Sequence, residues 1–181
     1  MLTEPRAIRY PIDSPPSSGA AIEIAEGILW FRLPLPMALD HVNVYALDDG
    51  DAWTLVDTGF DTKRSRAIWS ELLSGPLAGK PVGRVIVTHH HPDHVGLAGW
   101  LQVTHGAEIY MSRTAWLTAR MLTLDEQARP PEETVEFYKS AGMDADILTK
   151  RIDERPFNFA DVVAPLRLGF TRLEDGAGIS I

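Results

Sequence analysis

Hydrophobic and polar positions along this chain follow two periods, and the change of period predicts its secondary structure. Apolar and polar side chains alternate over residues 42–47, and a second short apolar run covers residues 52–57. The sequence Asp-Asp-Gly at residues 48–50 separates the two runs. Alternation is typical of a half-buried strand, and Asp-Gly turns join antiparallel strands. We therefore predict a β-hairpin here, preceded by a strand at residues 27–33 that stops before Pro34.

The middle of the chain switches between the two periods. Residues 62–73 carry apolar side chains near helical spacing, and glycine and proline follow them, which predicts a helix. Residues 84–88 form a continuous apolar run, typical of a strand buried on both faces. A helix at residues 95–103 and a strand at 107–111 come next. This order predicts an α/β fold, a mixed sheet covered by helices.

The segment at about residues 112–165 is predicted to be a helical insertion. Its candidate helices are residues 113–124, 132–141 and 144–151, and strands are predicted at 167–173 and from 178 to the last residue. Several large apolar side chains occur in the insertion: Trp116, Met121, Leu122, Phe137 and Tyr138. They either line a pocket or lid for a partly apolar substrate or pack within the helices.

The first twenty residues differ from the rest in composition. Residues 1–20 are rich in proline and serine, so they are predicted to form an N-terminal arm, either packed on the domain or loose. The domain itself is predicted to cover residues 21–181.

Composition narrows the function classes. The 181 residues suit one domain, and the absence of cysteine excludes a thiolate metal site and a cysteine nucleophile. The net charge of −8 makes nucleic acid an unlikely partner, since binding phosphate backbones normally needs a basic patch. No secretory signal and no membrane-spanning apolar run is evident, so we expect a cytoplasmic protein without a membrane partner.

One cluster carries recognisable chemistry. The segment Thr88–His94 contains the pattern His-x-His-x-Asp-His, formed by His89, His91, Asp93 and His94. Imidazole and carboxylate groups suit zinc, iron or manganese. His89 and His91 are two residues apart, so an extended loop directs both side chains the same way. Asp93 and His94 begin a helix and are expected to diverge from the first pair, which suits two metal ions.

This motif resembles that of the metallo-β-lactamase superfamily, whose Thr-His-x-His-x-Asp-His signature matches residues 88–94 fully. The sequence Leu-Val-Asp-Thr-Gly at residues 55–59 matches a second element of that family. The resemblance implies an αββα sandwich, of which this chain covers the N-terminal half. It also implies that His89 and His91 hold the first metal ion and that Asp93 and His94 hold the second. Asp57 would lie behind them and orient a ligand.

The same resemblance implies a metal-dependent hydrolase. Two ions, usually zinc, activate a hydroxide that attacks an ester, thioester, amide or phosphoester of a small-molecule substrate. Asp93 would act as the catalytic residue that orients the nucleophile or moves its proton. His41, just before a strand that leads toward the site in such folds, is a candidate for the substrate pocket. His90 and His105 are expected to have no ligand role.

The sequence departs from the family pattern after residue 111, because no histidine follows Met111. The second half of the family fold normally supplies three more ligands. Two ligands for each ion are fewer than the about three of a catalytic site, so full metal occupancy is not expected. We therefore expect a truncated domain that is inactive by itself. The alternative is a non-catalytic half-domain that associates with a partner or a second copy as a homodimer.

Overall fold

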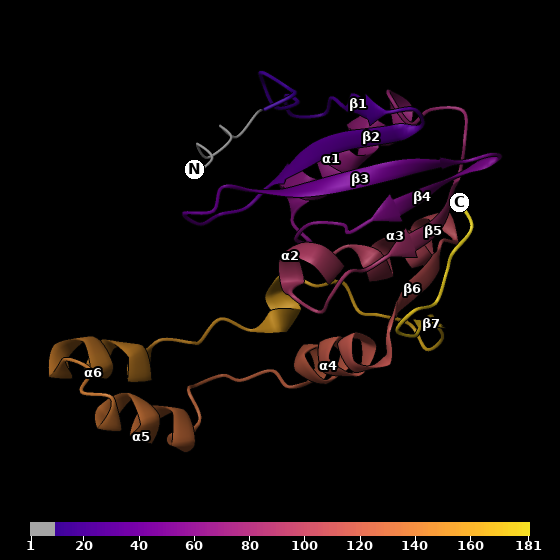
Figure 1. Ribbon diagram of the computed structural model, residues 1–181. Helices are drawn as coiled ribbons and strands as arrows, with labels where there is room; N and C mark the ends of the chain where they lie inside the picture. The colour runs from indigo at the N-terminus through magenta and orange to yellow at the C-terminus, as the bar shows by residue number, and fades with distance from the viewer. Residues whose placement is uncertain (1–9) are drawn as a thin grey trace, which may run out of the picture.

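A computed structural model describes residues 10–181, and a mixed sheet of seven strands lies at its centre (Figure 1). The strands lie side by side in chain order. They are β1 (Ile22–Ala25), β2 (Ile28–Pro34), β3 (His41–Asp49), β4 (Ala52–Val56), β5 (Val82–Ile86), β6 (Glu108–Ser112) and β7 (Thr171–Leu173). The predicted fold class, a mixed sheet with helices, is confirmed.

The type of strand pairing changes once across the sheet. The pairs β1–β2, β2–β3 and β3–β4 are antiparallel, and the pairs β4–β5, β5–β6 and β6–β7 are parallel. Tyr45 pairs with Val56 across β3 and β4, which confirms the predicted hairpin. Gly50 in its turn has φ +67°, a conformation that glycine adopts without strain. Because β4 and β5 are parallel, their carboxyl ends meet at one edge of the sheet.

The helices follow the predicted positions closely. They are α1 (Lys63–Ser74), α2 (Pro92–Val95), α3 (Ala98–His105), α4 (Arg113–Leu124), α5 (Glu132–Ser140), α6 (Ala145–Asp153) and a 3₁₀ turn η1 (Phe159–Asp161). Thr62 begins α1, because its hydroxyl accepts a hydrogen bond from the Ser65 backbone N–H at 3.0 Å. Within the predicted insertion the structure therefore contains three α-helices and a short turn.

The hydrophobic core lies between the sheet and the helices on one of its faces. On β2, Phe31 and Leu33 are fully buried, whereas the alternating Trp30 and Arg32 are partly exposed. Trp69 of α1 packs edge-on against Phe31, with ring centroids 5.2 Å apart. Figure 1 shows α1 and α3 on the same side of the strands. Burial of these aromatic and aliphatic side chains fixes the helices on the sheet.

The opposite face of the sheet is only partly covered, and this corrects one prediction. The strand at residues 84–88 was expected to be buried on both faces, but Arg84 and Ile86 are partly exposed while Val85 is buried. The prediction was wrong because a continuous apolar run does not show which face a helix covers.

The strand predicted from residue 178 is also wrong. Residues 174–181 contain no strand, and the Ser180 carbonyl accepts a hydrogen bond from the Arg84 side chain at 3.0 Å.

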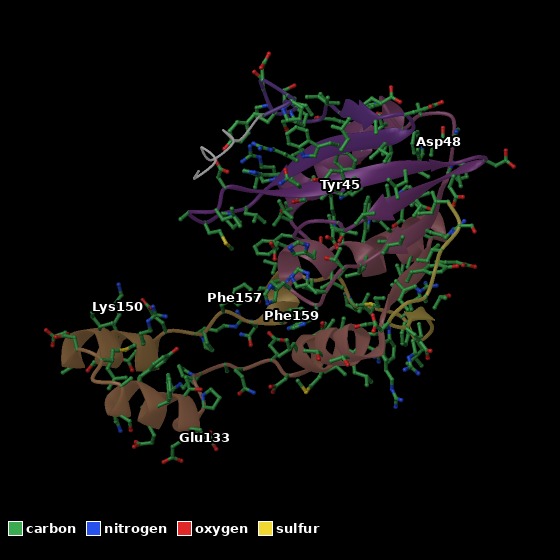
Figure 2. The ribbon with its side chains drawn as sticks, in the orientation of Figure 1. Tyr45, Asp48, Glu133, Lys150, Phe157 and Phe159 are labelled. Atoms are coloured by element: carbon green, nitrogen blue, oxygen red, sulfur yellow. The ribbon has the colours of Figure 1, made fainter. Side chains whose placement is uncertain are left out.

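Helices α5 and α6 extend away from the sheet as a pair. Figure 2 places Glu133 of α5 and Lys150 of α6 far from Tyr45 and Asp48 of β3. Neither helix contains a buried residue. The apolar side chains of this pair therefore remain partly accessible.

The predicted arm lies partly outside the described residues, which begin at residue 10. Residues 10–20 contain neither helix nor strand. Among the described residues, no helix combines the length and apolar character needed to span a membrane.

Candidate metal centre

The histidine motif lies in the loop that joins β5 to α2. Thr88 to His91 follow β5, and Pro92 occupies the first position of α2, where its missing N–H costs no helical hydrogen bond. Asp57 follows β4, the parallel neighbour of β5. The ends of two adjacent parallel strands therefore bring Asp57 to the motif, although 37 residues separate it from His94.

Asp57 has an unusual backbone conformation. Its φ is +65°, and among residues 10–181 it is the only non-glycine residue with a positive φ. Such a conformation costs about 1–3 kcal/mol and persists only where the surroundings impose it. The Asp57 backbone N–H donates to the Ile86 carbonyl at 2.9 Å, which fixes this turn against the end of β5.

The buried carboxylate of Asp57 holds both ends of the motif. It accepts hydrogen bonds from the Thr88 backbone N–H at 2.9 Å and from the Thr88 hydroxyl at 2.8 Å. Its other contact is with the His94 ring, whose Nδ1 lies 2.7 Å from Oδ2. Asp57 therefore fixes the start of the loop and the orientation of its last histidine.

The same contacts determine which ring nitrogens remain available. Because the Asp57 carboxylate only accepts hydrogen bonds, Nδ1 of His94 carries a proton, and in the neutral ring Nε2 then has the lone pair. Nδ1 of His89 lies 3.0 Å from the Thr88 hydroxyl, which leaves Nε2 of that ring free as well. A histidine whose second nitrogen binds a carboxylate is the usual arrangement of a metal ligand.

Three of the histidine rings lie close together. The ring centroids of His89 and His91 are 4.5 Å apart, and those of His89 and His94 are 4.1 Å apart. Nε2 of His94 lies 3.3 Å from a carboxylate oxygen of Asp93. The short distance between the His89 and His91 rings is consistent with the expectation that both side chains point the same way. The expectation that His94 diverges from them is wrong, because the hydrogen bond to Asp57 turns its ring toward His89.

The electrostatic surroundings differ between two of these rings. Burial, together with the neighbouring His94 and His91, lowers the pKa of His89 and favours its neutral form. Burial alone would lower the pKa of His94 too, but its hydrogen bond with Asp57 and the charge of that carboxylate raise the pKa overall. Metal ions bind the neutral imidazole, so His89 is already in the form that a metal requires.

A second threonine supports the site from behind, and our sequence reasoning missed it. Thr58 is fully buried; its hydroxyl donates to the His94 carbonyl at 2.8 Å and accepts from the Leu97 N–H at 2.9 Å. The position of Thr58 directly after Asp57, at the end of a predicted strand, was the available signal. The fixed role of Thr88 in binding Asp57 was likewise not predicted.

The other predicted residues lie elsewhere. His41 contacts Asp40, with Nδ1 2.5 Å from Oδ1, and lines a hollow of about 170 Å³ that contains none of the motif residues. The structure therefore does not bring His41 to the motif, and its pocket role stays a prediction. His105 packs against Trp100, with ring centroids 5.4 Å apart.

The comparison with known proteins decides the family. The sequence model of the metallo-beta-lactamase superfamily matches residues 37–177, which is most of the chain. The chain belongs to the metallo-β-lactamase superfamily. The probable metallo-hydrolase YqjP of Bacillus subtilis (strain 168) is 41% identical over 73 residues, which cover 40% of this chain and 23% of YqjP.

Solved structures agree with this assignment. A beta-lactamase domain protein from Burkholderia ambifaria aligns with a TM-score of 0.75 and 28% identity, over 93% of this chain and 47% of that one. A metallo-beta-lactamase family protein from Thermus thermophilus shows the same fold, with a TM-score of 0.65 and 23% identity over 88% of this chain and 50% of that one. This superfamily chain therefore spans about half the length of these structures.

Members of the superfamily generally bind metal ions, often zinc. In the neutral rings the Nε2 atoms of His89 and His94, together with the carboxylate of Asp93, are suitable donors, and Asp57 supplies the orienting carboxylate. However, within residues 10–181 no three His, Cys, Asp or Glu side chains form a group that could hold a metal ion. The donor chemistry fits a metal, whereas the number of converging donors is below the about three of a catalytic zinc site.

Proposed function

We propose that this superfamily member is part of a metal-dependent hydrolase. The observation that carries the proposal is the Thr88–His94 motif with Asp57 bonded behind it, in a chain whose family match includes both. His89 and His91 would bind one metal ion, and Asp93 and His94 the second. Zinc is the proposed metal, with iron and manganese as the other candidates for nitrogen and oxygen donors.

When bound, the metal ions would supply a hydroxide at neutral pH and would polarise the bond under attack. The residues of this chain would orient that chemistry. Asp93, which contacts Nε2 of His94, would accept and move the proton of the nucleophile. Asp57 would keep the His94 ring in the tautomer that leaves Nε2 free. The substrate is proposed to be a small molecule with an ester, thioester, amide or phosphoester bond.

The incomplete set of donors limits what this chain is proposed to do alone. Because two donors for each ion leave too many open coordination positions, we propose that the chain by itself is inactive. Further donors would come from the second half of the family fold or from a second copy of the chain. The relatives of known structure, about twice as long, are consistent with the first source.

Metal binding by purified protein tests the proposal. Equilibrium dialysis against zinc, followed by elemental analysis, is expected to show binding by the wild type and loss of binding in the variant with both His89→Ala and His91→Ala. His105→Ala is the matched control, because it removes a histidine that lies outside the motif. Equal zinc binding by the double variant and the control would show that the ligand assignment is wrong.

A second candidate function is a non-catalytic half-domain that associates with another chain. The partly exposed face of the sheet, with Trp30 and Tyr45, is the observation that favours it. A firm dimer without metal, measured by size-exclusion chromatography with light scattering and by elemental analysis, would support this candidate. A monomer that binds zinc supports the hydrolase.

A further inference from the structure

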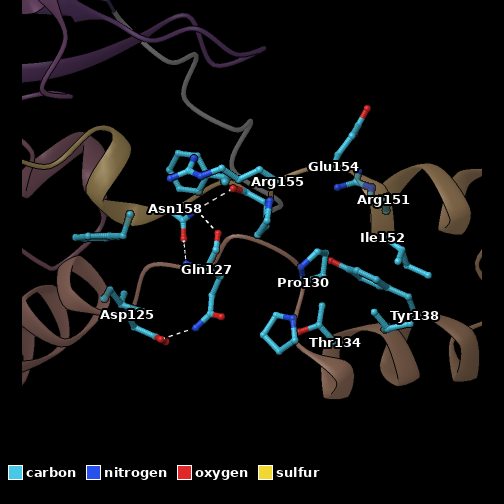
Figure 3. A pocket seen from close by; sticks show the side chains of 16 residues that line it. Asp125, Gln127, Pro130, Thr134, Tyr138, Arg151, Ile152, Glu154, Arg155 and Asn158 are labelled. Carbon is cyan, nitrogen blue, oxygen red and sulfur yellow. Dashed lines mark hydrogen bonds between the residues drawn. The ribbon is translucent and has the colours of Figure 1, made fainter.

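A large hollow lies in the helical insertion, separate from the histidine motif. It has a volume of about 490 Å³ and lies between the end of α4, the helices α5 and α6, and the segments 125–131 and 154–159 (Figure 3). None of its lining residues belongs to the motif. This volume is within the range of about 300–1,000 Å³ found for small-molecule sites.

The walls of this cavity are mostly apolar and come from four elements. Leu122 of α4, Val135 and Tyr138 of α5, Ile152 of α6 and Phe159 of η1 all line it. In Figure 3 the Tyr138 ring extends from α5 toward Pro130. Because α5 and α6 contain no fully buried residue, the protein itself leaves these apolar surfaces partly accessible. An apolar ligand would gain free energy by covering them.

Hydrogen bonds fix the two segments that enclose the cavity. Asn158, which is buried, accepts from the Gln127 backbone N–H at 2.6 Å and donates to the Gln127 carbonyl at 2.9 Å. Arg155 adds a second link, since it binds Glu126 and Asp161 at 2.8 Å each. The dashed lines in Figure 3 show the contacts of Asn158. The cavity is thus held open by its own scaffold, which lowers the ordering cost of binding.

The charges around the cavity leave one cation available. Asp125 accepts a hydrogen bond from the Gln127 side chain at 2.6 Å, and Glu154 lies 3.8 Å from the Lys150 ammonium. Arg155 already binds two carboxylates. Among the residues that the structure describes, no ion pair involves the remaining lining cation, Arg151. An anionic group at the end of an apolar ligand would find its partner there.

We propose that this cavity binds small organic anions with an apolar body, such as a medium-chain carboxylate. The apolar body lies against Leu122, Val135 and Ile152, and the anionic end binds Arg151. This site goes beyond the proposed hydrolase chemistry, because neither metal binding nor turnover is required for it.

Calorimetric titration of the purified chain with decanoate, below its micelle concentration, tests the proposal. Decanoate is expected to bind, and acetate, which lacks the apolar body, is not. Arg151→Gln is expected to weaken decanoate binding about tenfold, the effect of losing a charge-assisted hydrogen bond. The same variant should leave the binding of uncharged decan-1-ol unchanged. Lys139→Gln is the matched control, since it removes the same charge from a side chain whose ion-pair partner, Glu136, also lies outside the cavity.

Filling the cavity gives an independent readout. Val135→Trp and Ile152→Trp introduce bulk from α5 and α6 in turn, and each is expected to abolish binding of decanoate and decan-1-ol. Phe137→Trp is the control on α5, because Phe137 is 68% exposed and does not line the cavity. Neither helix contributes a buried residue, so circular dichroism should show an unchanged fold. No binding of decanoate to the wild type, binding of decanoate to both filled variants as tight as to the wild type, or no loss of affinity in Arg151→Gln would overturn the proposal.

Discussion

Replacing Thr58 by valine removes one hydroxyl from the support of the candidate metal centre while nearly conserving volume. Thr58 and Leu97 are both 0% exposed. The Thr58 hydroxyl accepts a hydrogen bond from the Leu97 N–H at 2.9 Å. The hydroxyl also donates to the His94 carbonyl, which keeps a second partner, the Thr58 backbone N–H, at 2.9 Å. The variant therefore loses the hydrogen bond to the His94 carbonyl, which stays bonded to the Thr58 N–H. It also leaves the buried Leu97 N–H without an acceptor.

The magnitude follows from these two losses. A lost hydrogen bond costs about 1 kcal/mol, and a buried donor without an acceptor costs about 1–3 kcal/mol more. The free energy of unfolding should therefore fall by about 2–4 kcal/mol. For a domain of this size each kcal/mol lowers Tm by about 2–4 °C, so thermal unfolding should shift down by roughly 5–15 °C.

Thr58→Ser is the matched control for this experiment, because it keeps the hydroxyl and removes only a methyl group. Loss of one buried methyl costs about 1 kcal/mol. Urea unfolding and calorimetry of the three proteins should therefore rank the wild type above the serine variant and the serine variant above the valine variant. A valine variant as stable as the serine variant would show that the hydroxyl does not hold the His94 segment as argued.

Three further results are expected. Asp57→Asn offers an amide donor to Nδ1 of His94, which moves the ring proton to Nε2, so zinc affinity in equilibrium dialysis should fall about 10–100-fold; unchanged affinity would contradict the orienting role. Gly99→Ala places a methyl group against backbone carbonyls of the segment after η1, so chemical unfolding should show a loss of about 1–3 kcal/mol, and an equally stable variant would refute this packing. The hydrogen bond from Arg155 holds the pKa of Asp161 below its ordinary value of 3.8. This contribution to stability is present above that value and is lost as the pH falls through the lowered pKa, so the Tm difference between the wild type and Arg155→Gln should vanish in acid; a constant difference across the titration would disprove the linkage.

Much of the fold could be predicted from local patterns. The hairpin around residues 48–50 follows from side-chain alternation and an Asp-Gly turn, both of which act over a few residues. The helix at α1 follows from its apolar spacing and its ending at Gly75. The prediction that residues 84–88 are buried on both faces was wrong, since an apolar run carries no information about what covers it.

The candidate metal centre could likewise be predicted only in part from the sequence. The ligand chemistry of His89, His91, Asp93 and His94 is a property of residue types and spacing, so it could be read from the sequence. The direction of His94 could not, because it depends on a hydrogen bond to Asp57 at the end of another strand. Whether these four side chains hold metal stays a prediction.

The sequence by itself determined the order of helices and strands between residues 27 and 173, the ligand types of the motif and the absence of thiolate chemistry. Only the tertiary structure decided that Asp57 binds Thr88 and His94, and that α5 and α6 enclose a cavity beside Arg151. The physical reason is the separation along the chain over which each kind of interaction acts. Periodicity and motif spacing act between near neighbours, whereas these contacts depend on the parallel pairing of β4 with β5 and on how a helical insertion returns to the sheet.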